Sequence, residues 1–210
     1  MSLSISGKTA IVTGAAKGIG LAIARHFVDR GAKVMFADID EARLTEEFHG
    51  SPGEDSVKRA FSCDLSQKLS MTNLLSATVD AFDRIDILVN ANRGFMVTDP
   101  LNPEDQSLEV LLKQNLISSV RLTQMTAKRM IAQAERDGRS EAPVGSIVNI
   151  STLAAQCTLP ELLAFSVAGA ALDQATRSLA LALAPDRIRV NGIAIGSVMS
   201  ASLQAALKEN

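Results

Sequence analysis

The segment Thr13-Gly14-Ala15-Ala16-Lys17-Gly18-Ile19-Gly20 lies between an apolar run that begins at Thr9 and an amphipathic stretch that ends near Arg30. This order predicts a strand, a tight glycine turn and a helix, with Gly18 and Gly20 allowing close backbone approach. The free N–H groups at the start of such a helix bind anions. The segment therefore predicts a parallel α/β fold and a pyrophosphate site. Its expected binding residues are Gly14, Ala16, Lys17, Gly18, Ile19 and Gly20.

The rest of the chain repeats the alternation of apolar runs and helical patterns. The expected strands are Thr9–Thr13, Lys33–Asp38, Val57–Cys63, Ile85–Asn90, Val144–Ser151 and Ile188–Ile195. The expected helices are Ile19–Arg30, Glu41–Phe48, Gln67–Phe82, Pro103–Ala134 and Pro160–Leu183. We predict one Rossmann-type domain over residues 1–210, a doubly wound parallel sheet flanked by helices. The polar stretch 134–143 is expected to be a solvated loop.

Composition narrows the classes of function. The net charge of -2 argues against nucleic acid or an anionic membrane as partner, and no apolar run reaches the roughly 18 residues of a membrane helix. The separated cysteines, Cys63 and Cys157, lack metal-ligand spacing, which predicts a reduced, cytoplasmic protein without a metal site. The chain contains no Tyr and no Trp, so no phenol is available as a proton donor.

Asp38 ends the second predicted strand, 18 residues after Gly20. A carboxylate at this place accepts hydrogen bonds from ribose hydroxyls and repels a 2'-phosphate, which favours NAD over NADP as the cofactor. Asp38 is also compatible with a role as helix N-cap. Lys17 keeps NADP open, because a cation in the turn would meet a phosphate; its other interpretation is a solvated loop charge.

These residues resemble the short-chain dehydrogenase/reductase family of nicotinamide-dependent oxidoreductases, along nearly the whole chain. The turn has the TGxxxGxG spacing of that family, and Cys63-Asp64-Leu65 matches the strand end whose Asp contacts the adenine. Asp64 is equally suited to cap the next helix. In Asn90-Ala91-Asn92-Arg93, Asn90 matches the family pattern, and Arg93 stands where Gly is usual. Arg93 is either a rim charge or a contact for an anionic group.

The resemblance implies further cofactor contacts near the end of the chain. In Ile195-Gly196-Ser197-Val198-Met199-Ser200, Ile195 replaces the usual Pro and Ser200 keeps a hydroxyl at the place of the usual Thr. The resemblance-implied cofactor residues are Asp64, Leu65, Asn90, Ala91, Gly196, Val198 and Ser200. The chain ends at Asn210, before the final helix and strand that family members usually carry.

The resemblance also implies the catalytic positions. Asn115 matches the active-site Asn, and Thr152 matches the catalytic Ser, with Ser151 directly before it. Thr152 keeps a hydroxyl that polarises a carbonyl group by hydrogen bonding. The alternatives are that Asn115 is a polar residue inside a helix and that the two hydroxyls satisfy backbone groups at the strand end.

The family's Tyr-x-x-x-Lys pair falls at Phe165 and Gly169, because the Tyr position lies 13 residues after Thr152. Phe has no proton to donate, and Gly has no charge to lower a neighbour's pKa. General acid–base groups contribute about 10²- to 10⁴-fold to a rate. The standard hydride-transfer reaction between alcohols and carbonyls is therefore expected to be severely impaired.

Three functions remain open from the sequence. The first is an NAD-binding protein without standard turnover, and the second is an active NAD-dependent oxidoreductase in which Thr152, Ser151, Ser166 or water moves the proton. The third is a structural or partner subunit that binds no nucleotide. The substrate of the enzyme would be a small molecule that the sequence does not specify. The resemblance implies a homodimer or homotetramer, formed through the helices around 104–132 and 160–184.

Overall fold

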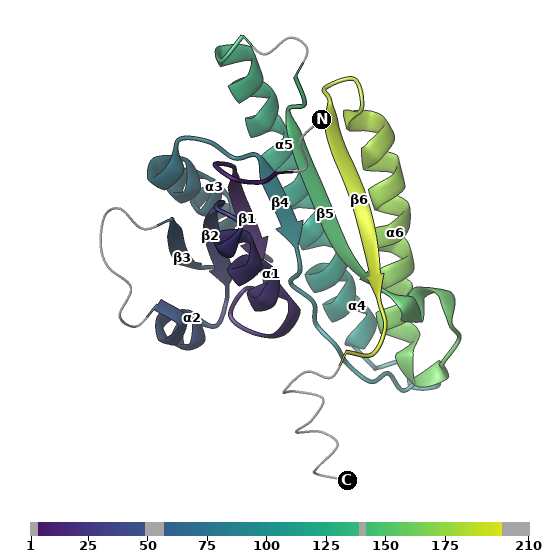
Figure 1. Cartoon of the computed structure of the whole chain (residues 1–210). Helices are drawn as coiled ribbons and strands as arrows, with labels where there is room; N and C mark the ends of the chain where they lie inside the picture. Colours follow the sequence, from purple (N-terminus) through teal and green to yellow (C-terminus); the bar gives the residue numbers. More distant parts are fainter. Residues whose placement is uncertain (1–3, 49–56, 139–141, 199–210) are drawn as a thin grey trace.

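The strands of the protein form one parallel sheet. The structure is a computed structural model that describes residues 4–48, 57–138 and 142–198. The strands are β1 (Thr9–Thr13), β2 (Lys33–Asp38), β3 (Lys58–Ser62), β4 (Ile87–Asn90), β5 (Gly145–Thr152) and β6 (Ile188–Ile195). They pair in the order β3-β2-β1-β4-β5-β6 (Figure 1). This is the doubly wound order, and it confirms the predicted fold class.

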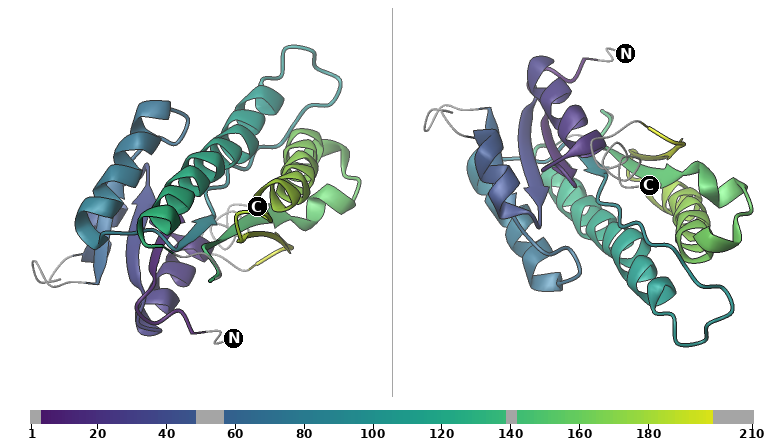
Figure 2. Two further views of the ribbon diagram at one scale, coloured as in Figure 1. Left: turned by 90° about the horizontal axis from the view of Figure 1, so that it is seen from above. Right: turned by 90° about the horizontal axis from the view of Figure 1, so that it is seen from below.

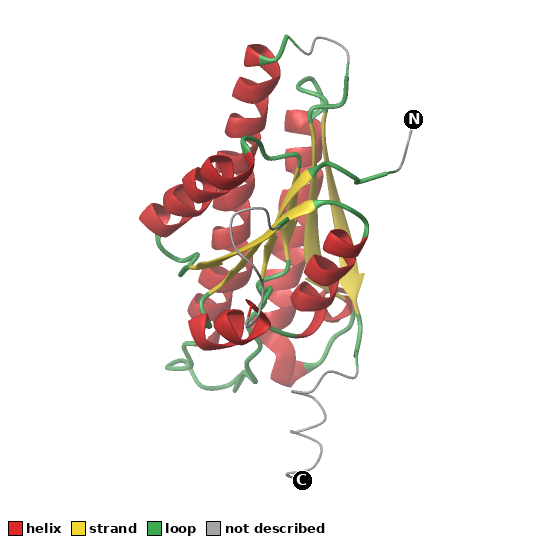
Figure 3. Cartoon of the chain, turned by 60° about the vertical axis from the view of Figure 1, so that its left-hand side comes forward, coloured by secondary structure: helices red, strands yellow, loops and turns green. Residues whose placement is uncertain are grey.

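Helices cover both faces of the sheet, which therefore lies as a middle layer between them (Figure 3). The α-helices are α1 (Gly18–Asp29), α2 (Glu41–Phe48), α3 (Lys68–Phe82), α4 (Ser107–Leu111), α5 (Ser118–Arg136) and α6 (Leu163–Leu183). Seen along the sheet, α3, α5 and α6 lie on one face and α1 on the other (Figure 2). None of the helices in the described ranges is long and apolar enough to cross a membrane.

Each face has its own apolar core. The core under α3 and α5 includes Met71, Leu74, Leu122 and Met130, all at most 1% exposed. The core under α1 and α2 is richer in alanine than the other core, and Phe36 is its largest buried side chain. All five residues of β1 are buried, which explains why that strand is a continuous apolar run and not an alternating one.

The second face is less covered toward β6, which is an edge strand of the sheet. Arg189, Asn191 and Ile193 point away from the helices of the first face and are exposed, Ile193 to 51%. Within residues 4–48, 57–138 and 142–198, no helix packs over this part of the sheet. The strands β1 and β2 are thus covered on both faces, whereas β6 is covered on one.

The prediction of one helix over Pro103–Ala134 is wrong. Residues 99–106 form turns, in which Asp105 accepts the Ser107 N–H at 2.7 Å, so α4 begins at Ser107. After α4 the backbone widens into a π-helical segment, η1 (Leu112–Ile117), before α5 continues. Asn115 lies in this segment, and π-helical turns inside helices are frequent at functional sites.

Other boundaries shift by a few residues. The helix predicted from Pro160 starts with a 3₁₀ turn, η3 (Pro160–Leu162), and α6 begins at Leu163. The loop predicted over 134–143 starts later, because α5 extends to Arg136, and residues 139–141 lie outside the described ranges. The remaining strand and helix ends move by no more than two residues, the usual scatter of such boundaries.

Candidate functional site

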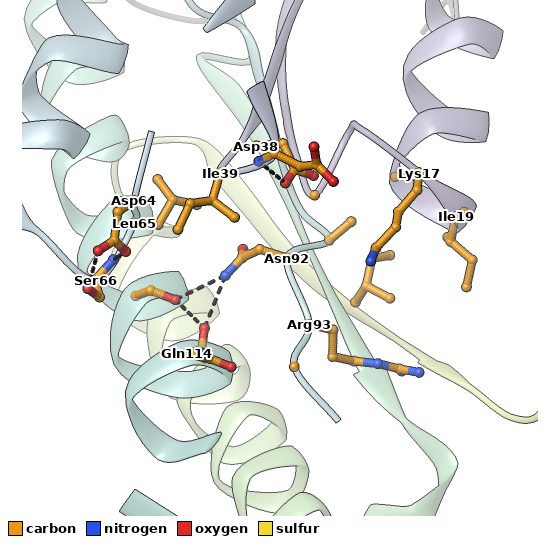
Figure 4. Close-up of a pocket in the computed structure, with 18 of the residues that line it drawn as sticks. Lys17, Ile19, Asp38, Ile39, Asp64, Leu65, Ser66, Asn92, Arg93 and Gln114 are labelled. Atoms are coloured by element: carbon orange, nitrogen blue, oxygen red, sulfur yellow. Dashed lines mark hydrogen bonds between the residues drawn. The ribbon is translucent and has the colours of Figure 1, made fainter. Parts of the chain in front are cut away.

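A pocket of about 740 Å³ opens at the carboxyl ends of the strands, where the chain order reverses between β1 and β4. Ligands of doubly wound sheets bind at this switch point. Figure 4 shows the pocket, with Asp64 on the left, Asp38 at the top, and Lys17 and Arg93 on the right. The predicted residues that line it are Gly14, Lys17, Gly18, Ile19, Gly20, Asp38, Asp64, Leu65, Ala91, Gly196 and Val198.

The glycine turn is held against the end of β4 by close backbone contact. Gly14 has a φ of +65°, and a Cβ at this position would lie 2.7 Å from the Ala91 carbonyl oxygen. A Cβ at Gly20 would overlap the Gly14 carbonyl oxygen. Both contacts are to backbone atoms, which cannot move aside without shifting the strand. The turn and the first N–H groups of α1 therefore form a cradle that fits a pyrophosphate.

Asp38 is fixed by two backbone groups. Its Oδ2 accepts the Ala16 N–H at 3.0 Å, and its Oδ1 accepts the Asp40 N–H at 3.1 Å. An ionised carboxylate has further lone pairs, so both oxygens still accept hydrogen bonds from a ribose diol. Ala16 itself is buried and reaches the site only through this bond. The carboxylate orientation is thus set before any ligand arrives.

Asp64 and Cys63 form the neighbouring wall. Asp64 accepts the Ser66 N–H and the Ser66 hydroxyl, both at 2.8 Å, and these bonds, the backbone one above all, lower the pKa of the carboxyl. Burial raises the pKa of the Cys63 thiol to about 12, with help from the Asp38 and Asp64 charges. No group of three or more His, Cys, Asp or Glu side chains in the described ranges is placed to hold a metal ion.

A polar clamp joins β1 to the loop after β4. The buried Thr13 hydroxyl accepts the Ala91 N–H at 3.0 Å and donates to the Asn92 side-chain oxygen at 2.8 Å. The Asn92 amide then donates to the Gln114 carbonyl at 3.0 Å, inside η1. Sequence reasoning missed Asn92 and Gln114 as pocket residues, because nothing local in the sequence links a loop to a π-helical turn.

Asn115 holds Gly94 of the same loop through its side-chain amide. Its Nδ2 donates to the Gly94 carbonyl at 3.0 Å, and its Oδ1 accepts the Gly94 N–H at 2.7 Å. The side chain is 5% exposed and does not line the pocket. Both ends of its amide are occupied, so in this structure Asn115 positions the loop at Gly94.

Arg93 is the central side chain at the far end of the pocket. Its Nη1 donates to the Ser151 carbonyl at 2.9 Å, and the guanidinium carbon lies 5.1 Å from the centre of the Phe165 ring. Phe95 also contacts Phe165, with the two ring centres 5.2 Å apart in an edge-to-face arrangement. Loss of water contact lowers the pKa of Arg93 from its ordinary value.

The hydroxyls predicted as catalytic are bonded to the backbone. Thr152 accepts the Ala154 N–H at 3.2 Å and caps the 3₁₀ turn η2 (Leu153–Gln156), while Ser151 donates to the Gly169 carbonyl at 3.4 Å. Ser166 donates to the Leu163 carbonyl, one turn earlier in its own helix. These bonds agree with the interpretation that the strand-end hydroxyls satisfy backbone groups.

Several predicted residues lie away from the pocket. Ser151, Thr152, Phe165 and Gly169 are close to one another and buried, but none of them lines it. The Asn90 amide donates to Asn149 at 2.8 Å and to Thr123 at 3.0 Å within the core. Ser200 lies outside the described residues. The lining residues that sequence reasoning missed are Ile39, Asp40, Cys63, Ser66, Asn92, Gly94, Val110, Lys113, Gln114, Ser118 and Ile150.

Comparison with known proteins agrees with this geometry. The family model described as "short chain dehydrogenase" matches residues 8–210. The chain is 33% identical over 201 residues to L-fucose dehydrogenase of Mus musculus, covering 92% of this chain and 66% of that protein. It is 32% identical over 197 residues to galactitol 2-dehydrogenase of Agrobacterium fabrum, covering 93% and 72% of the two chains.

Solved structures show the same arrangement. The structure of 3-ketoacyl-(acyl-carrier-protein) reductase from Brucella melitensis, complexed with NADH, superposes with a TM-score of 0.83 at 26% identity and covers 96% of this chain and 80% of its own. A short-chain dehydrogenase/reductase of unknown function from Caenorhabditis elegans, with cofactor, gives a TM-score of 0.80 at 27% identity, covering 98% and 78%. The fold, the glycine turn and the matches over nearly the full chain lead to one conclusion: the chain belongs to the short-chain dehydrogenase family of oxidoreductases, whose members bind nicotinamide cofactors.

Proposed function

We propose that this chain binds an adenine dinucleotide, NAD in preference to NADP, and does not carry out the family's standard hydride transfer. The observation that carries this proposal is the contrast within one pocket. The groups suited to adenosine and pyrophosphate, from Gly14 to Asp64, line it, whereas the residues at the proposed catalytic positions are buried behind it.

The preference for NAD rests on Asp38. Its carboxylate is held by the N–H groups of Ala16 and Asp40 and lines the pocket. A 2'-phosphate at this place would meet a fixed negative charge, which costs binding free energy. Lys17 lines the same pocket, but it is an exposed side chain at the N-terminal end of α1, where solvent screens its charge.

The loss of turnover rests on the positions that correspond to the family's Tyr and Lys. We place Phe165 and Gly169 there, and neither side chain moves a proton. A nicotinamide cofactor supplies hydride chemistry when bound, and the protein must supply the matching proton path. The Ser151 and Ser166 hydroxyls donate to backbone carbonyls, which does not favour the alternative of an active oxidoreductase that uses them as proton donors. Thr152 accepts a backbone N–H, and it is buried and does not line the pocket.

Calorimetric titration with NAD and NADP, combined with turnover assays, tests this proposal. We expect saturable NAD binding, NADP binding about tenfold weaker or more, and no turnover of sugars or polyols above background. Sugars and polyols come first because the relatives named above are an L-fucose and a galactitol dehydrogenase. Turnover by protein that mass spectrometry shows to be free of other dehydrogenases would overturn the loss of chemistry.

We also propose a homodimer or homotetramer, formed through the helices around 104–132 and 160–184. On α6, Leu163, Val167 and Leu181 are 38%, 43% and 80% exposed, an unusual exposure for apolar side chains along one helix. Sedimentation velocity at micromolar concentration tests this proposal. A monomer would contradict it, and loss of the oligomer in Leu181→Glu would support it.

A further inference from the structure

The pocket stops before the residues that correspond to the family's reactive centre. Ser151, Thr152 and Phe165 are 2%, 5% and 4% exposed, and Gly169 is buried beside them. Arg93, Gly94 and Ile150 do line the pocket at this end. Arg93, which lines the pocket, and Phe95, which does not, both pack on Phe165.

Two contacts hold the Arg93 side chain in place. The Ser151 carbonyl accepts its Nη1 at 2.9 Å, and its guanidinium lies over the Phe165 ring at 5.1 Å. A cation over an aromatic face is stabilised by the ring quadrupole, more so where water is partly excluded. Asn115 holds the adjacent Gly94 through two hydrogen bonds, so the backbone that carries Arg93 is also fixed.

The guanidinium keeps its charge and most of its donors. Arginine stays protonated in proteins, and of the Arg93 side-chain nitrogens only Nη1 donates a hydrogen bond to a described residue. In the described part of the chain, no carboxylate lies within ion-pair distance of Arg93. Figure 4 shows the side chain extending beneath Lys17, on the opposite side of the pocket from Asp64.

The layout of a bound dinucleotide follows from the fold. The pyrophosphate belongs at the start of α1, and the adenosine ribose belongs at Asp38. The nicotinamide half of the dinucleotide must then extend toward the ends of β4 and β5, where Arg93 and Ile150 line the pocket. A nicotinamide ring would have to enter the space next to Arg93, and the ring of NAD+ carries a positive charge of its own.

We propose that Arg93 closes this end of the pocket against the nicotinamide ring, so that the chain binds ADP-ribose in preference to NAD+. The inference rests on the proposed function, because both ligands share the ADP half that Asp38 and the glycine turn would hold. ADP-ribose ends in a sugar whose hydroxyls accept hydrogen bonds from the free guanidinium donors. NAD+ adds a bulky cation at that place, which Arg93 resists by volume and by charge.

Calorimetric titration with ADP-ribose, NAD+ and NADH tests the inference, because the three ligands differ only at the far end. We expect ADP-ribose to bind the unaltered chain at least tenfold more tightly than NAD+. In Arg93→Gly the space opens, and NAD+ should bind as tightly as ADP-ribose or more tightly. Arg93→Met keeps the bulk of the side chain and removes its charge, so ADP-ribose should still bind more tightly than NAD+. The difference in affinity between NAD+ and NADH should be smaller in this variant than in the unaltered chain.

Arg30→Ala is the matched control, since Arg30 is an exposed cation at the end of α1 outside the pocket, and its affinities should equal those of the unaltered chain. Thermal melting of each variant verifies that it is folded. Equal affinities of the unaltered chain for NAD+ and ADP-ribose, or an unchanged ratio in folded Arg93→Gly, would overturn the assignment of Arg93 alone. Failure of all three ligands to bind would instead overturn the proposed function.

Discussion

The two ends of the pocket are built from the same kind of unit, a strand followed by a turn, yet they present their polar groups in opposite ways. At the adenosine end, backbone N–H groups hold the carboxylates of Asp38 and Asp64 at the pocket surface. At the far end, the hydroxyls of Ser151 and Thr152 are bonded inward to the backbone, behind Arg93.

The two ends differ in how strongly their site residues take part in the packing of the fold. The glycine cradle is part of the packing between β1, α1 and β4, because Gly14 and Gly20 both face backbone atoms at contact distance. A substitution there disturbs the sheet itself. Phe165 and Gly169 lie on α6, where the nearest atoms to a Cβ at Gly169 from outside the helix would be side-chain atoms, the Thr152 methyl group first. On the proposed function, nucleotide binding is tied to the packing of the fold, whereas the proton chemistry depends on side chains that change separately.

The largest effect is expected from rebuilding the far end. The double variant Phe165→Tyr with Gly169→Lys supplies a phenol and a cation, but a Cβ at position 169 would lie 2.6 Å from the Thr152 methyl group. Adding Thr152→Ser removes that methyl group, and adding Arg93→Gly opens the pocket. We expect the quadruple variant to gain about 10²- to 10⁴-fold in NADH-dependent turnover of a ketone over the unaltered chain.

The double variant by itself serves as the comparison. Crowding against Thr152 should make it less stable than the variant that also carries Thr152→Ser, by about 1–3 kcal/mol in urea unfolding. Equal stabilities would mean that α6 shifts to admit the side chain. A folded, NAD-binding quadruple variant without turnover would mean that the far end lacks more than these residues.

The next effect concerns the cradle. Gly20→Ala places a Cβ on the Gly14 carbonyl oxygen, so α1 must move away from the turn, and we expect NAD affinity in calorimetry to fall by about 100-fold. Gly7→Ala is the matched control, because Gly7 lies outside the pocket, its Cβ would meet no atom within 4 Å and only the φ of +73° is unfavourable, at about 1–2 kcal/mol. Equal losses in the two variants would contradict the role of backbone contact.

A smaller effect is expected at Asp38. Asp38→Asn keeps the shape of the side chain and removes its charge. NAD affinity should fall about tenfold, because hydrogen bonds to charged groups contribute about 1.5–3 kcal/mol, and the affinities for NADP and NAD should become more similar. Calorimetry with both dinucleotides measures the ratio. Asp29→Asn, at an exposed carboxylate at the end of α1, should change neither affinity. An unchanged NADP-to-NAD ratio in Asp38→Asn would leave cofactor preference unexplained by this residue.

The smallest effect concerns Asp64 and pH. Hydrogen bonds from Ser66 hold the pKa of Asp64 below its usual range, so the folded state favours the ionised form. The resulting stability is fully present above the unfolded pKa near ~4 and is lost as the pH falls through the lower folded pKa. Asp64→Ala should cost about 0.5–1 kcal/mol at pH 7, because solvent screens this group. Urea unfolding should show that the cost shrinks toward pH 3; a cost independent of pH would contradict this cause.

The sheet could be predicted from sequence because its strands are apolar runs bounded by turn residues, and β1 and β2 match their predicted limits. The helix from Pro103 could not, since the turns before Ser107 interrupt its start and the π-helical segment contacts Asn92 and Gly94 in a distant loop. The adenosine side of the pocket follows from local spacing. The stacking of Arg93 on Phe165 joins residues far apart in the chain, and periodicity does not encode such a contact.

The two thiols of the chain differ in exposure, and this difference allows local opening of the structure to be followed by alkylation. Cys157 is exposed, whereas Cys63 is buried at the end of β3, with its pKa raised to about 12. Because the thiolate is the reactive form, a neutral-pH alkylating reagent consumes Cys157 at once and reaches Cys63 only during opening of this end of the sheet. The rate of Cys63 alkylation therefore measures the rate of that opening. Since Cys63 also borders the pocket, a bound ligand should slow this second alkylation step.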